Sequence, residues 1–132
     1  MEDNALMIPV SFGELFDKIS ILKIKSIKFS DPVKLLNVNK EFEKLMSVAS
    51  ARFDQAIIEQ CILSMMEVNQ TLWDIEEAIR KKEFNKQFDE EFISLARNVY
   101  FYNAERSEKK KLINKELGSL IVEEKDYSTG WK

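Results

Sequence analysis

The sequence is almost free of the two residues that interrupt helices, and this feature constrains its fold more than any other. Its 132 residues include three Gly and two Pro. In a helix interior Gly costs about 1 kcal/mol and Pro about 3 kcal/mol relative to Ala. Neither occurs between Asp54 and Asn85, which predicts one helix of about 31 residues and roughly 47 Å, at a rise of 1.5 Å per residue. The chain therefore favours long helices.

Four segments begin with residues that typically start helices. Ser11 is followed three residues later by Glu14, the spacing of a capping box. Asp31 is an N-cap residue before Pro32, which is tolerated at the first helical position. Three carboxylates at 89–91 favour the positive end of a helix dipole. The expected helices span about 11–29, 31–48, 50 or 54–84, and 89–117, the last ending before Gly118.

The third expected helix carries an apolar seam with alternating steps of three and four residues, which is typical of packing against another helix. Its members are Ile58, Cys61, Met65, Val68, Leu72, Ile75 and Ile79. A short loop before residue 89 predicts an antiparallel hairpin with the fourth helix, in which residue numbers at one level add up to about 173. The predicted fold class is all-α, an antiparallel bundle of about four helices built on this hairpin.

The first expected helix is apolar on more than one side. It is the natural partner for the apolar 57–68 stretch of the third helix, because the part of the fourth helix opposite that stretch is rich in charge. Its far side, at Ile21 and Ile24, requires further cover, and a second subunit is one candidate. We therefore expect a homodimer.

Short apolar runs flank the helices, at 6–10 and 120–122. Their residues favour strands and fall outside the helical pattern, so the two runs either pair with each other or dock on the helices. We expect a single domain over 1–132, with 1–10 and 119–132 as extended flanks.

A few polar residues fall inside the apolar sectors of the helices, and the hairpin register brings several of them to similar levels. One interpretation is structural: Glu76, Arg80 and Arg97 form salt bridges, while Asn69 and Asn103 specify register. The other is a cationic pocket for a small carboxylate, phosphate or sugar phosphate, with Glu76 as its one acid–base candidate. The predicted ligand-binding residues are Lys23, Glu76, Arg80, Arg97, Asn103 and Arg106. Lys110 lies in the same apolar stripe of the fourth helix as Asn103 and Arg106.

Composition excludes several other chemistries. The chain has no His, one Cys (Cys61) and a formal net charge of −3, which argues against imidazole catalysis, thiolate metal sites and a general nucleic-acid binder. The acidic residues at 89–91 are explained by helix capping, so no metal or cofactor is expected. The lysines at 109–111 are typical of a solvated face near a helix carboxyl end. With no membrane segment and a lone thiol, we expect a cytoplasmic protein.

Several stretches resemble a small bacterial family of unknown function. They include the opening Val10 to Leu22, of the form VSxGELxDKIxIL, together with 36–38, 72–76 and 88–106. The resemblance covers nearly the whole chain and implies no reaction, cofactor or catalytic residue. The residues themselves lead to two hypotheses: a homodimeric interaction or assembly module, or an all-α enzyme or binding protein for a small anionic metabolite.

Overall fold

The computed structural model describes residues 4–126 and contains four α-helices in this part of the chain. They are α1 (Phe12–Lys28), α2 (Pro32–Ser50), α3 (Gln55–Phe84) and α4 (Glu90–Leu117). The predicted all-α class and the four expected helices are confirmed. The boundaries differ most at the end of α2, which continues to Ser50 and leaves Asp54 as the N-cap of α3.

Each helix begins at a side-chain cap that the sequence predicts. The side-chain oxygens of Ser11, Asp31, Asp54 and Asp89 each accept a hydrogen bond from a backbone N–H two or three residues further on. At the other end of α4, Gly118 adopts a left-handed conformation with φ of 72°. Because these contacts are local, they form wherever the residue pattern occurs.

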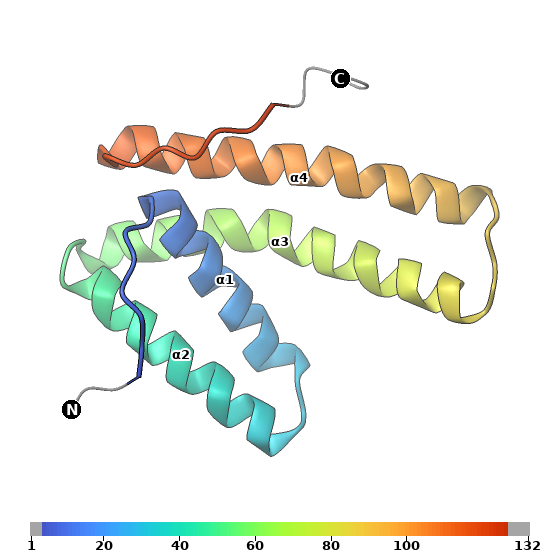
Figure 1. Ribbon diagram of the computed structural model, residues 1–132, viewed down its shortest axis with the longest axis horizontal. Coiled ribbons are helices and arrows are strands. Elements are labelled where there is room, and N and C mark those ends of the chain that lie inside the picture. Colours follow the sequence, from blue (N-terminus) through green and yellow to red (C-terminus); the bar gives the residue numbers. More distant parts are fainter. Residues whose placement is uncertain (1–3, 127–132) are drawn as a thin grey trace.

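The two long helices α3 and α4 form an antiparallel hairpin, and α1 and α2 form a second hairpin that crosses one end of it (Figure 1). Two contacts report the register between the long helices. Lys82 Nζ lies 2.8 Å from a carboxylate oxygen of Glu91, and Lys109 Nζ lies 3.0 Å from the carbonyl oxygen of Ser64. The residue numbers in both pairs add up to 173. The same two ammonium groups also lie 2.9 Å from Asp89 and Glu67, in pairs that add up to 171 and 176, so the register is close to the predicted value of about 173.

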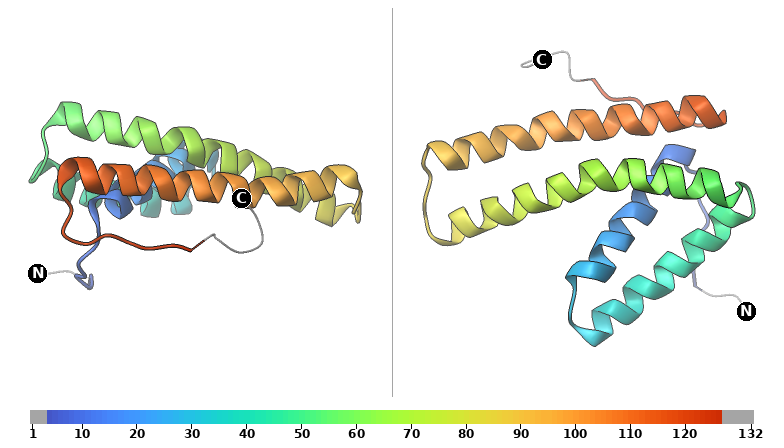
Figure 2. Two further views of the ribbon diagram at one scale, coloured as in Figure 1. Left: turned by 90° about the horizontal axis from the view of Figure 1, so that it is seen from above. Right: turned by 180° about the vertical axis from the view of Figure 1, so that it is seen from behind.

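The core lies where α1 crosses the amino-terminal half of α3 and the carboxyl-terminal half of α4 (Figure 2). Phe16 and Ile19 on α1 and Met65 on α3 are completely buried there. The expected partnership between α1 and the apolar stretch of α3 is confirmed. Ile24 is also buried, within the chain itself, whereas Ile21 is half-buried, so Ile24 does not require a second subunit to cover it.

The other half of the long hairpin, around the 84–90 turn, extends beyond α1 and α2 as an arm of two helices (Figure 1). Apolar side chains are exposed on this arm, among them Phe84 at 85% exposure and Phe88 at 55%. Two helices alone can bury only the faces that they turn toward each other. The arm therefore leaves apolar surface in solvent.

The flanks do not pair as strands within residues 4–126, so the suggested strand pairing is not found there. The amino-terminal run around Leu6 is extended and highly exposed. The carboxyl-terminal segment turns back along α4, with Ser119 N donating to the carbonyl oxygen of Asn114 at 2.8 Å. The part of the predicted flank at 127–132 lies outside the described residues. No helix in the described part of the chain is long and apolar enough to cross a membrane.

Candidate functional site

One carboxylate, that of Asp17, lies where α1, α3 and α4 meet, with its side chain 2% exposed. Arg106 on α4 donates to it from Nε to Oδ1 at 3.0 Å and from Nη2 to Oδ2 at 2.6 Å. Asn69 on α3 donates from Nδ2 to Oδ1 at 2.8 Å, and to Ser20 Oγ at the same distance. A two-pronged guanidinium–carboxylate contact is both strong and directional. Asp17 thus links α1 to both helices of the long hairpin.

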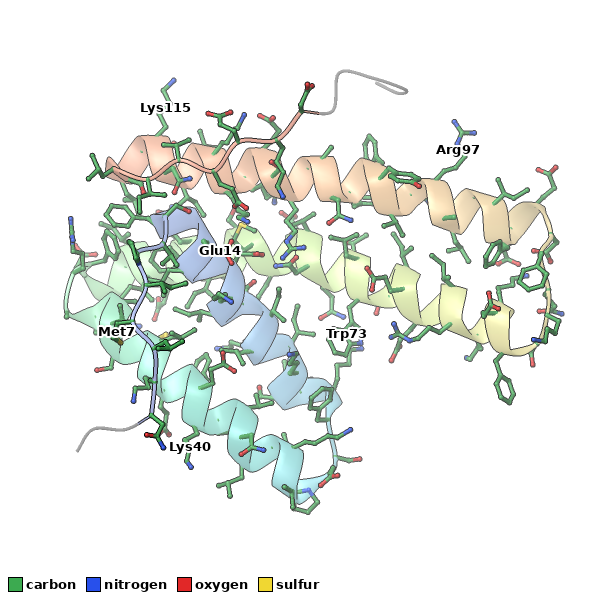
Figure 3. The ribbon with its side chains drawn as sticks, viewed as in Figure 1. Met7, Glu14, Lys40, Trp73, Arg97 and Lys115 are labelled. Atoms are coloured by element: carbon green, nitrogen blue, oxygen red, sulfur yellow. The ribbon has the colours of Figure 1, made fainter. Side chains whose placement is uncertain are left out.

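A second ion-pair group lies next to Asp17 and is centred on Lys110. The Lys110 ammonium is 2.8 Å from Glu14 Oε1, 2.9 Å from Glu123 Oε1 and 3.8 Å from Asp17 Oδ2. Figure 3 shows Glu14 on the side of α1 that faces α4. Glu123 belongs to the carboxyl-terminal segment, so this lysine holds that segment against α1 and α4.

The start of α1 approaches α4 more closely than side chains normally permit. A Cβ at Gly13 would lie 2.5 Å from the carbonyl oxygen of Lys110. Gly13 N donates to Asn114 Oδ1 at 2.7 Å, and Phe12 N donates to Ser119 Oγ at 3.1 Å. The backbone donors at this helix start are therefore satisfied by the chain itself, and they do not await an external anion.

Charges of both signs alternate in the two groups. Within the described residues the carboxylates are Glu14, Asp17 and Glu123, and the cations that contact them are Arg106, Lys110, Lys125 and Lys18, the last at 3.9 Å from Glu14. A shallow pocket of about 240 Å³ opens beside them, lined by all of these side chains except Asp17 and Lys18 and also by Asn103 and Ser107. Its walls carry both signs of charge and no large excess of either.

Proton equilibria in this region reflect the same contacts. Hydrogen bonding to Asp17 raises the pKa of Arg106, and hydrogen bonding from Lys110 lowers the pKa of Glu123. Burial acts to lower the pKa of Lys110, but its bonds to Glu14 and Glu123 outweigh burial, and the pKa is raised. All three shifts favour the charged forms. The contacts thus stabilise the charged forms of Arg106, Lys110 and Glu123.

Of the six predicted ligand-binding residues, the structure brings together two. Arg106 Nη1 lies 3.5 Å from Asn103 Oδ1, and both line the shallow pocket. Glu76 and Arg80 pair with each other at 4.0 Å, but their side chains are 52% and 68% exposed. They do not reach Asn103 or Arg106, so the salt-bridge interpretation holds for this pair alone.

The remaining two residues lie elsewhere. Lys23 is exposed and lines a different groove, of about 300 Å³, together with residues of α2 and α3 such as Phe42 and Met66. Arg97 is exposed and points away from α3 in Figure 3. The predicted single cluster of six residues is therefore not formed. A 100° helical wheel assigns a residue to a broad sector, and the sector does not decide which neighbouring helix the side chain faces.

Asn69 and Asn103 do not bond to each other, because Asn69 turns to α1 instead. Sequence analysis also missed Asp17, the residue around which this site is organised. A signal for it exists: Gly13, Asp17 and Ser20 follow steps of four and three, a polar and small stripe on an otherwise apolar helix. Lys110 is buried, as its apolar stripe indicates, so the solvated-face interpretation of 109–111 is wrong at this position.

Metal ligation and thiol chemistry are the other candidates in the described part of the chain. Among residues 4–126 no group of three His, Cys, Asp or Glu side chains is arranged to hold a metal ion. Cys61 is half-buried, and burial raises the pKa of its thiol. A raised pKa keeps the thiol protonated and makes it a poor nucleophile.

The model of a family described as a family of unknown function, DUF6165, matches residues 6–131. No curated protein and no solved structure matches the chain.

Proposed function

We propose that this chain, which belongs to the family of unknown function DUF6165, is a helical interaction module that assembles as a homodimer. The observation that carries the proposal is the exposed apolar surface of the long hairpin. Large apolar side chains are exposed along α4 and at the hairpin turn, including Phe84, Ile93, Phe101 and Leu112. Exposed apolar surface beyond scattered single residues is a feature of sites where proteins associate.

The polar cluster around Asp17 supports this proposal because its charges are already paired. Arg106 and Lys110 contact carboxylates of the same chain at 2.6 to 2.9 Å. An anionic ligand would have to displace these carboxylates and leave Asp17 buried without a partner, which is costly. The ion pairs of the cluster instead hold α1 against the hairpin of α3 and α4. A rigid hairpin is what a docking surface needs.

Light scattering coupled to gel filtration tests the proposal. We expect a mass of twice 15.5 kDa at micromolar concentration, with dissociation on dilution. The measurement extends from the low micromolar range to several hundred micromolar, since a transient assembly can have a weak dissociation constant. A mass of one chain throughout that range contradicts self-assembly.

A second candidate function, binding of a small anionic metabolite, is favoured by the shallow pocket at Asn103 and Arg106. Both residues belong to the predicted ligand set, and the pocket also exposes Lys125 on the carboxyl-terminal segment. Thermal shift with phosphorylated and carboxylated metabolites tests it, because a ligand of the native state raises the melting temperature. Lys125→Ala is the variant to compare, since it removes a pocket cation without touching Asp17. A flat screen, or equal shifts in both proteins, contradicts this candidate.

The proposal also covers the cellular compartment and two classes of partner that we exclude. A lone thiol suits a reducing compartment, so we place the module in the cytoplasm. Its net charge of −3 disfavours nucleic acid, and we propose neither nucleic acid nor a membrane as its partner.

A further inference from the structure

The face of α4 that points away from α3 carries one continuous stripe of residues at steps of three and four. We call it the outer stripe: Glu90, Ile93, Arg97, Phe101, Ala104, Glu108, Leu112 and Lys115. Ile93, Phe101 and Leu112 are 51%, 48% and 54% exposed. Figure 3 shows Arg97 and Lys115 both directed away from α3. Such steps keep a stripe on one helix face.

The charged members of the outer stripe are unpaired within the described chain. No ion pair or hydrogen bond joins the side chains of Glu90, Arg97, Glu108 or Lys115 to another side chain of residues 4–126. Lysines on the other faces of α4 behave differently: Lys109 pairs with Glu67 at 2.9 Å. The stripe thus combines exposed apolar side chains with charges that lack a partner.

The order of residues along the outer stripe is complementary to its own reverse. Read forward it runs acidic, apolar, basic, apolar, apolar, acidic, apolar, basic. Aligned antiparallel with a second copy, each acidic residue meets a basic one and each apolar residue meets an apolar one. The resulting pairs are Glu90 with Lys115, Ile93 with Leu112, Arg97 with Glu108, and Phe101 with Ala104, each occurring twice.

We propose that a second copy of this chain docks along the outer stripe in antiparallel orientation, with a twofold axis between Tyr102 and Asn103. The inference rests on the proposed self-assembly and specifies its surface and register. A twofold interface uses the same patch on both subunits, and self-complementarity is its requirement. The pairing of charges at e and g positions specifies orientation in coiled coils by the same principle.

The shape of the outer surface of α4 is compatible with this register. A hollow of about 420 Å³ lies on its outer side, lined by Glu90, Ile93, Ser94, Arg97, Asn98 and Phe101. In the proposed register the partner's stripe from Ala104 to Leu112 lies over this hollow. Arg97 becomes the residue that receives the partner's Glu108, which gives one of the four arginines of the chain a defined role.

Charge reversal with rescue tests this register. Arg97→Glu places two carboxylates opposite each other at both symmetry-related contacts, and Glu108→Arg places two guanidinium groups there. Since like charges at an interface are strongly unfavourable, each single variant is expected to raise the dimer dissociation constant about 10-fold or more. The double variant restores the opposite-charge pairs and is expected to return to within about 3-fold of the parent. Residues 97 and 108 are about 16 Å apart along one helix, so rescue reports a contact between two chains.

The controls separate failure of the inference from failure of the proposed function. Arg80→Glu makes the same charge change on an exposed side chain of α3, and its dissociation constant should stay near that of the parent. Circular dichroism melting confirms that every variant folds. A parent protein that remains monomeric overturns both proposals. A dimer that tolerates the single reversals, or that the double variant does not rescue, overturns the antiparallel register and leaves self-assembly standing.

Discussion

Arg106 on α4 holds Asp17 on α1 through two hydrogen bonds, at 3.0 Å from Nε and 2.6 Å from Nη2. The two residues are 89 positions apart in the chain. The pair therefore joins the first helix of the fold to the last. Since the guanidinium is planar, the pair also sets the direction in which α1 crosses the hairpin.

Asp17→Ala should destabilise the protein by about 3 kcal/mol, the lower end of the range for breaking a buried pair, because Arg106 keeps some access to water. The substitution leaves both Arg106 and Asn69 without their buried acceptor. Urea unfolding followed by circular dichroism measures the effect. Asp74→Ala is the matched control: Asp74 is 62% exposed and lies 3.8 Å from Lys28, so its loss should cost under about 1 kcal/mol. Equal effects of the two substitutions would show that the contacts of Asp17 with Arg106 and Asn69 do not stabilise the fold.

Gly13→Ala should destabilise the protein although alanine favours helices. The added Cβ would lie 2.5 Å from the carbonyl oxygen of Lys110, and backbone atoms cannot rotate away. We expect a loss of about 1 to 3 kcal/mol from forced displacement, against the gain of up to about 1 kcal/mol that an open helix site gives. Thermal melting measures it. A rise in melting temperature would contradict the close approach of α1 to α4.

Phe16→Ala and Phe84→Ala should differ sharply. Phe16 is completely buried in the core, whereas Phe84 is 85% exposed near the hairpin turn. Removing a buried phenyl ring costs about 3 to 5 kcal/mol, and an exposed substitution stays within about 0.5 kcal/mol. Urea midpoints of the two variants, measured at a fixed protein concentration, give the comparison. Similar midpoints would mean that the core does not lie at the crossing of α1.

Acid should release the carboxyl-terminal segment from Lys110. The pKa of Glu123 is lowered by its hydrogen bond from Lys110, so its contribution to stability is present above the unfolded value of 4.5. That contribution is lost as pH falls through the lower pKa of the folded state. Because Glu123 is 44% exposed, we expect a small effect.

Glu123→Gln provides the measurement. The variant should unfold at a lower urea concentration than the parent at pH 7, and the gap between the two urea midpoints should close as the pH falls below about 4.5. Proteolysis at the carboxyl-terminal segment should be faster in the variant at neutral pH. A gap that stays constant down to pH 3 would contradict the assigned ion pair.

Much of the architecture follows from interactions between residues that are near each other in the chain. The caps at Ser11, Asp31 and Asp54 use donors within three residues, and a residue pattern is enough to recognise them. The hairpin of α3 and α4 has a short connection, so its register follows by counting from the turn. Lys82 and Glu91 meet where that counting places them.

The candidate site was less predictable because its central residue, Asp17, comes from α1, which has no short connection to α3 or α4. Arg106 and Asn103 are recognisable as polar residues on an apolar stripe, and the hairpin register predicts their neighbours on α3. Arg106 instead bonds to Asp17 on α1, and Asn103 accepts from Arg106. No rule of spacing within one helix, or across one turn, relates residue 17 to residue 106.

By itself, then, the sequence determined four helices, their caps and the register of the long hairpin, because capping, chain breakers and short turns act over a few residues. The tertiary structure alone decided which buried charges meet. The crossing of α1 over the hairpin depends on how closely Gly13 approaches Lys110 and on the direction of the Asp17–Arg106 pair. Both arise from packing between elements that are distant in the chain, where many arrangements satisfy the same apolar pattern and only one satisfies the polar groups as well.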